Sequence, residues 1–119
     1  MRGRLGRWGP LAAWMALIWL LSAQPGDVLS VGWEIPDKLA HAVVYLVLGL
    51  LAARAVGPRG SGAAVLGLAA GWGALDELHQ RFVPLRQADP RDWLADLVGA
   101  ACGLVLVRLW RRRGGNDGL

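Results

Sequence analysis

The stretch AAVLGLAAGWGAL, residues Ala63–Leu75, contains no charged side chain, and neither does LAAWMALIWLL, residues Leu11–Leu21. A helix buried in a soluble bundle keeps a polar face at the 3.6-residue period, whereas these two stretches are apolar on every face. Two further apolar stretches lie at residues 39–56 and 94–107. The sequence therefore predicts helices that lie within a lipid bilayer.

The composition supports this prediction. The chain of 119 residues is 55% hydrophobic and 18% charged, and its mean hydropathy is +0.37. Soluble domains typically contain about 25% charged and roughly 45–50% apolar residues. The hydrophobicity excludes intrinsic disorder, and Cys102, the only cysteine, cannot form a disulfide scaffold. A chain of this length has room for one domain.

The apolar stretches leave two alternatives open. Each is shorter than the roughly 20 residues that a spanning helix needs, although polar ends and snorkelling Arg and Trp side chains extend the span. The helices of a soluble bundle are therefore one alternative. The other is that the first stretch is a cleaved signal peptide, because it has a basic start and Ser22-Ala23 near a cleavage point. Leu21 is a poor residue three positions before that cut.

We predict an all-α polytopic membrane protein in which residues 1–119 form one domain, a bundle of four transmembrane helices. The predicted spans are residues 8–23, 39–56, 61–80 and 93–110. Basic residues gather at the N-terminus, in the loop between the second and third spans, and at the end of the fourth span. These three places share one side of such a bundle. The residues are Arg2, Arg4, Arg7, Arg54, Arg59, Arg108, Arg111, Arg112 and Arg113. By the positive-inside rule, both termini are predicted to lie in the cytoplasm. The same placement explains the net charge of +4 without nucleic-acid binding, which is not predicted.

Small residues recur four positions apart in three of the apolar stretches. The pairs are Gly49 and Ala53, Gly67 and Gly71, and Gly99 and Gly103. Small residues at this spacing allow helix backbones to approach closely in lipid, so these pairs are candidate helix–helix contacts. Chance is a fair alternative in a chain with 17 glycines.

Polar residues gather at the other ends of the predicted helices, on the outer side. Four-residue spacings place Asp37, His41 and Tyr45 on one face of the second helix, Asp76 and Gln80 on one face of the third, and Asp92 and Asp96 on one face of the fourth. Lys38 and Glu77 are their neighbours in the chain and belong to the same predicted polar group. Three helices are therefore predicted to direct polar side chains toward one region.

Two interpretations of these polar residues remain open. Intramembrane acids face the bundle interior and find partners there, so the residues could form a structural network with Lys38, His41, Arg81, Arg86 and Arg91. The other interpretation is a functional site, because His41 among carboxylates can serve as a general acid or base. The oxygen-rich set suits Mg²⁺ or Ca²⁺ better than Zn²⁺, but it lacks a diagnostic spacing. Neither a metal nor another cofactor is predicted.

Four short motifs, in this order, resemble the VanZ-like family of small bacterial membrane proteins. They are DK-x-x-H-x-x-x-Y at 37–45, DE-x-x-Q at 76–80, F-x-P-x-R at 82–86 and D-x-x-x-D-x-x-G at 92–99. The resemblance covers residues 37–103. Asp96 departs from the family pattern, which commonly has Asn there, and the acid adds charge to the predicted site. The resemblance implies a multi-pass protein of the bacterial cytoplasmic (inner) membrane.

The family takes its name from a protein associated with low-level resistance to teicoplanin, a glycopeptide that binds cell-wall precursors. The resemblance therefore implies a cell-envelope protein whose outward polar residues bind a wall precursor, a lipid head group or the glycopeptide itself. One alternative is a membrane enzyme with His41 as general acid or base, Asp37 or Asp76 orienting it, and Arg86 holding an anion. A small transporter is the third interpretation, which requires acids at mid-bilayer.

Overall fold

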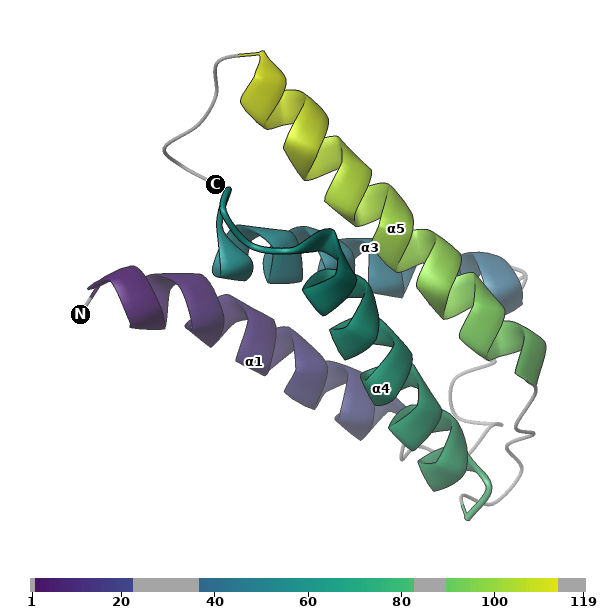
Figure 1. Cartoon of the computed structure of the whole chain (residues 1–119). Coiled ribbons are helices and arrows are strands. Elements are labelled where there is room, and N and C mark those ends of the chain that lie inside the picture. The colour runs from purple at the N-terminus through teal and green to yellow at the C-terminus, as the bar shows by residue number, and fades with distance from the viewer. Residues whose placement is uncertain (1, 23–36, 83–89, 114–119) are drawn as a thin grey trace.

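The computed structural model describes residues 2–22, 37–82 and 90–113 (Figure 1). These ranges form four helices: α1 (Arg2–Ser22), α3 (Asp37–Val56), α4 (Gly62–Gln80) and α5 (Pro90–Arg112). Each helix contains one of the four apolar stretches, which confirms the prediction that these four stretches are helical.

Two of the described helices are long and apolar enough to cross a membrane, at residues 39–56 in α3 and 91–112 in α5. The two uncharged stretches that led to the membrane prediction lie instead in α1 and α4. Charges limit the apolar length of both helices, because the first turns of α1 contain Arg2, Arg4 and Arg7, and Asp76 and Glu77 lie near the end of α4. Length and composition therefore mark α3 and α5 as the membrane-spanning candidates.

The connection between α3 and α4 is formed by two local capping arrangements. Gly57 has a φ of 79°, in the left-handed region that glycine tolerates, and its N–H donates to the Ala53 carbonyl over 3.1 Å. Ser61 then caps α4, because its hydroxyl accepts hydrogen bonds from the N–H groups of Ala63 and Ala64. The chain therefore reverses direction between Val56 and Gly62.

The helix α1 begins six residues before the predicted span and contains Pro10 in its interior. Proline lacks the N–H that would bond to the carbonyl four residues earlier, which belongs to Gly6. The guanidinium of Arg54 at the end of α3 donates to this carbonyl. An arginine of one helix thus replaces the backbone hydrogen bond that Pro10 removes from another.

The tightest packing in the bundle is between α3 and α5, which cross in Figure 1. A Cβ on Gly99 of α5 would collide with the backbone carbonyl of Ala42, and a Cβ on Gly103 would collide with that of Leu46. From α3, a Cβ on Gly49 would collide with the backbone of Ala100. The small-residue prediction is therefore confirmed for these glycines, which bring two helix backbones into direct contact.

The same prediction is wrong for Gly67 and Gly71 of α4. Both are exposed, and no atom lies within 4 Å of the position of a Cβ on either. The inward face of α4 is instead formed by Val65, Ala69, Gly73, Asp76 and Gln80. The spacing is the same as in α5, but α4 is rotated so that the small residues Ala69 and Gly73 face the neighbouring helices instead.

Aromatic side chains hold α1 against the other helices. The Trp14 indole donates a 3.0 Å hydrogen bond to the Val44 carbonyl of α3. The Trp19 ring stacks on His79 of α4, with ring centroids 4.0 Å apart and an interplanar angle of 7°. These contacts pack α1 along both α3 and α4.

The glycine contacts of α5 predict a position-specific effect of adding one methyl group. Gly99→Ala should lower the free energy of unfolding by about 1–3 kcal/mol, the usual cost of overpacking, because two backbones must separate. Gly67→Ala is the matched control and should leave stability unchanged or slightly higher. Unfolding in mixed micelles, followed by circular dichroism as dodecyl sulfate is added, measures both. Equal effects of the two substitutions would contradict the observed helix crossing.

Candidate functional site

Three helices bring polar side chains together near one end of the bundle. His41 and Tyr45 lie one turn apart near the start of α3, and Asp92 and Asp96 one turn apart near the start of α5. Asp76 lies in the last turn but one of α4. We call His41, Tyr45, Asp76, Asp92 and Asp96 the polar cluster. The sequence predicted that these residues converge, and the structure brings them together.

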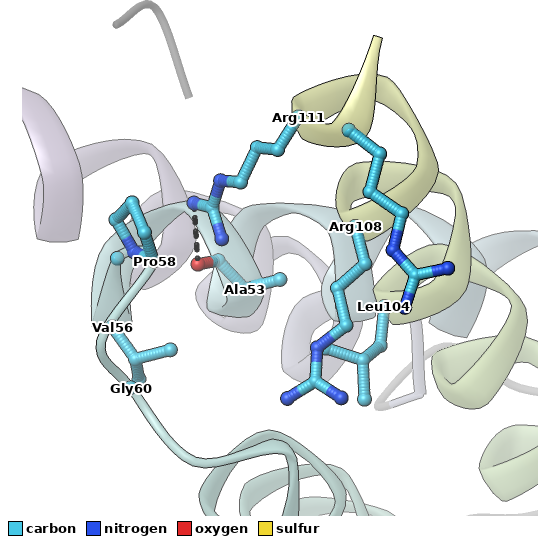
Figure 2. A pocket seen from close by; sticks show the side chains of 9 residues that line it. Ala53, Val56, Pro58, Gly60, Leu104, Arg108 and Arg111 are labelled. Atoms are coloured by element: carbon cyan, nitrogen blue, oxygen red, sulfur yellow. Dashed lines mark hydrogen bonds between the residues drawn. The ribbon is translucent and has the colours of Figure 1, made fainter. Parts of the chain in front are cut away.

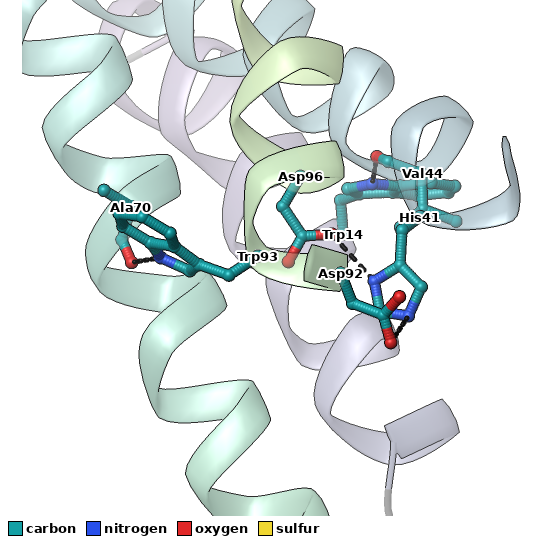
Figure 3. A network of polar contacts seen from close by, with 7 residues as sticks. All are labelled: Trp14, His41, Val44, Ala70, Asp92, Trp93 and Asp96. Carbon is teal, nitrogen blue, oxygen red and sulfur yellow. Dashed lines mark hydrogen bonds and ion pairs between the residues drawn. The ribbon is translucent and has the colours of Figure 1, made fainter. Parts of the chain in front are cut away.

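His41 lies at the centre of the polar cluster, between two carboxylates of α5 (Figure 3). Its Nδ1 is 2.8 Å from Oδ1 of Asp96, a short hydrogen bond. Its Nε2 is 3.7 Å from Oδ2 of Asp92, an ion-pair distance when the ring is protonated. Because Asp92 and Asp96 are one turn apart, one face of α5 holds both edges of the imidazole.

The side chains of the polar cluster differ in their exposure to solvent. The side chain of Asp96 is 3% exposed, whereas that of Asp92 is 13% and that of His41 is 21% exposed. The imidazole edge that carries Nε2 therefore lies on the more accessible side, and the edge that carries Nδ1 points into the bundle. A ligand would meet His41 and Asp92 first.

Asp76 and Tyr45 form the buried side of the polar cluster. Both are almost fully buried, and Asp76 lies within electrostatic range of His41, Tyr45 and Asp96. The Tyr45 hydroxyl is buried and has no hydrogen-bond partner among the described residues. Gln80, one turn beyond Asp76, is buried as well. α4 therefore presents a polar end to the pair formed by His41 and Asp96.

A glycine and a tryptophan, neither of which the sequence analysis selected, position α4 against Asp96. A Cβ on Gly73 would lie 3.0 Å from Oδ2 of Asp96 and 3.2 Å from Cδ1 of Trp93. The Trp93 indole donates a 2.9 Å hydrogen bond to the Ala70 carbonyl of α4 (Figure 3). The sequence contains a weak indication that Gly73 lies near the predicted site. Gly73 precedes Asp76 by three residues, so both lie on one face of the helix.

Glu77 lies outside the polar cluster. Its carboxylate faces Arg81, the residue that follows α4, at 3.8 Å, and both side chains line a hollow of about 260 Å³ between α4 and α5. Trp93 lines the same hollow from α5. The Arg81 side chain is 61% exposed, so this is a surface ion pair.

Three other predicted site residues cannot be placed in the cluster. Asp37 and Lys38 begin α3, but their side chains lie outside the described part of the structure. Arg86 lies outside the described residues altogether. Within residues 2–22, 37–82 and 90–113, no group of three or more His, Cys, Asp or Glu side chains is arranged to hold a metal ion. That no cofactor binds stays a prediction.

The geometry of the polar cluster suits proton exchange and the binding of hydrogen-bond donors. The bond to Asp96 fixes the orientation of the imidazole, so that Nε2 is directed toward the accessible side. A carboxylate that orients a histidine in this way is a common arrangement for a general acid or base. The same contacts also hold α3 and α5 together, since buried charges are stable only when paired.

The contact between His41 and Asp96 predicts a strong energetic coupling between the two side chains. His41→Ala and Asp96→Ala should each lower the free energy of unfolding by about 1–3 kcal/mol, because each leaves a buried polar partner without its hydrogen bond. The double variant should lose less than the sum of the two, by about 0.5–3 kcal/mol.

The surface pair of Glu77 and Arg81 is the matched control for this cycle. Its coupling should be no more than about 1 kcal/mol, because both side chains reach solvent. Unfolding titrations in mixed micelles of the four variants of each cycle measure both couplings. Additive effects of His41→Ala and Asp96→Ala would contradict the buried contact.

Comparison with known proteins agrees with the motifs and the geometry. The family model described as VanZ/LLP1 matches residues 8–111, which include all four described helices in whole or in large part. No curated protein and no solved structure matches the chain. The match extends over most of the chain and includes every residue of the polar cluster. The chain therefore belongs to the VanZ/LLP1 family.

Proposed function

We propose that the chain is a multi-pass protein of the bacterial cytoplasmic membrane with four spans and both termini in the cytoplasm. The clustering of arginines supports this orientation. Contacts of Arg7 with Gly57, of Arg54 with Gly6 and of Arg111 with Ala53 bring the start of α1 and the ends of α3 and α5 together. Arginine concentrates on the cytoplasmic side of membrane proteins. The polar cluster, at the other ends of α3 and α5, then faces outward.

In this orientation, we propose that the polar cluster binds a component of the cell envelope. The observation that carries the proposal is the set of three carboxylates around His41, of which Asp76 and Asp96 are buried. Acids inside a membrane protein are energetically costly and usually mark a functional site. Family membership is consistent with a cell-envelope protein linked to glycopeptide resistance.

The chemistry of the polar cluster restricts the ligand. Carboxylates and the Tyr45 hydroxyl accept hydrogen bonds, so they suit a ligand that presents hydroxyl, amide N–H or amine groups. The sugar and peptide parts of a wall precursor, a lipid-linked sugar and a glycopeptide antibiotic all present such groups. We therefore propose a wall or lipid-linked precursor, or a teicoplanin-type glycopeptide, as the ligand.

An envelope-modifying enzyme is the second candidate, and the orientation of His41 favours it. With Nδ1 held by Asp96, Nε2 lies on the accessible side beside Asp92, where a general base would meet a ligand. None of the residues of the polar cluster is a Ser or a Cys, so a hydrolytic reaction here would use water as the nucleophile.

The orientation predicts which cysteines react from outside the cell. In a Cys102→Ser background, a cysteine at Phe82, which is 81% exposed at the end of α4, should react with an impermeant maleimide in intact cells. A cysteine at Pro58, exposed in the loop between α3 and α4, should react only after the membrane is permeabilised. The reverse pattern would overturn the proposed topology.

The binding proposal predicts loss of function without loss of protein. In a strain that lacks the chain, His41→Ala and Asp76→Asn should fail to restore glycopeptide susceptibility and envelope composition to wild-type values. His41→Ala removes the imidazole that would face the ligand, and Asp76→Asn removes a carboxylate charge from the buried side of the polar cluster. Minimum inhibitory concentrations and mass spectrometry of lipids and wall fragments measure both properties at matched abundance.

Arg113→Gln, an exposed substitution at the opposite end, is the control and should restore both properties. Full function of His41→Ala and Asp76→Asn would refute the site. A species in the mass spectra that changes with the wild type but not with His41→Ala would favour the enzyme over the binding protein.

A further inference from the structure

A second polar region lies at the far ends of α3 and α5 from the polar cluster. An open cavity of about 400 Å³ lies there, between the last turns of α5, the end of α3 and the loop that follows it (Figure 2). Its charged wall consists of Arg108, Arg111 and Arg112, and its apolar wall includes Ala53, Val56 and Leu104. We call it the arginine cavity.

The arginines of this cavity reach in different directions. Arg111 donates a 3.3 Å hydrogen bond to the Ala53 carbonyl at the end of α3 (Figure 2). The guanidinium Nη2 of Arg108 lies 2.9 Å from the position that a Cβ on Gly62 would occupy, at the start of α4. Arg112 is exposed on the cavity wall. The guanidinium groups of Arg108 and Arg111 therefore lie against neighbouring helix ends, whereas the Arg112 side chain is exposed.

A fourth arginine adds positive charge at the rim. The guanidinium of Arg7 from α1 occupies the place that a Cβ on Gly57 would take, and Gly57 lines the cavity. Arg111 lies within electrostatic range of both Arg7 and Arg108. Among the residues that the structure describes, the acids whose side chains are placed lie toward the other end of the bundle. Three arginines line the cavity and a fourth lies at its rim.

Membrane topology explains why arginines are numerous on this side, but not why three of them line one cavity. Guanidinium groups bind phosphate through paired, charge-assisted hydrogen bonds. The apolar wall of Val56 and Leu104 suits the glycerol and upper acyl carbons that follow a lipid phosphate. Basic pockets between transmembrane helices bind anionic lipid head groups in this way.

We propose that the arginine cavity binds the phosphate of an anionic phospholipid from the adjoining leaflet. A soluble phosphate compound presents the same anion, and the experiment separates the two sources. The proposal is independent of the polar cluster and its ligand, so either can fail without the other.

The test titrates the full-length protein, in a neutral detergent, with phosphatidylglycerol, with phosphatidylcholine and with inorganic phosphate. Native mass spectrometry counts the bound molecules. The double variant Arg108→Gln/Arg112→Gln removes two charges from the cavity wall, and both side chains are exposed, so folding should be preserved. Arg59→Gln/Arg113→Gln is the matched control, because it removes two exposed charges that do not line the cavity.

We expect the wild type and the control variant to bind phosphatidylglycerol more tightly than phosphatidylcholine. The cavity variant should bind phosphatidylglycerol at least about tenfold more weakly, the change that corresponds to losing one charge-assisted hydrogen bond. Equal affinities of the two double variants would overturn the proposal. Inorganic phosphate that binds in an arginine-dependent manner, while phosphatidylglycerol does not, would overturn the lipid assignment and leave a soluble phosphate compound as the ligand.

Discussion

The direct contact between the backbones of α3 and α5 is the constraint on which the rest of the structure depends. Gly99 lies against the carbonyl of Ala42, and Gly103 against that of Leu46, so the two helices cross in one register. Ala42 follows His41 in the chain, and Gly99 lies three residues after Asp96. The register that the glycines impose therefore also places the imidazole beside its carboxylate. In lipid, where no hydrophobic force drives helices together, such a contact supplies the packing that fixes a bundle.

This crossing gives the bundle two chemically unlike ends. Near the starts of α3 and α5, three carboxylates surround one histidine, and near their ends, arginines surround a cavity. The helix interiors between the two ends are apolar, with Leu48, Ala52, Ala100 and Val107 in the buried core. An apolar centre with opposite charges at its ends is a stable arrangement across a membrane, since each charged group stays near an interface.

Much of the architecture could be predicted from the sequence, because charges, Pro and Gly bound the four apolar stretches sharply. The convergence of His41 and Asp96 was also predictable, since successive antiparallel helices place the starts of α3 and α5 at the same end of the bundle. The rotation of α4 was not. Gly67 and Gly71 have the same spacing as Gly99 and Gly103, and the uncharged stretch of α4 has no polar face. The position of Gly73, three residues before Asp76, was therefore only a weak indication of which small residues turn inward. The bond from Arg54 to the carbonyl that Pro10 leaves without a partner depends on tertiary structure, which spacing along the chain cannot reveal.

Asp96 bears on the unlike ligands that we propose for the two ends. An Asn at this position would bond to His41 without adding a charge. With Asp96, two carboxylates of α5 contact one imidazole, and Asp76 lies within electrostatic range of it. Buried charge of this kind is stable only when a proton or a donor group compensates it. The ligands that we propose differ accordingly: groups that donate hydrogen bonds or carry positive charge at the polar cluster, and acceptors with negative charge at the arginine cavity. A phosphate is attracted by arginines and repelled by carboxylates, so the two proposed sites suit different chemical groups.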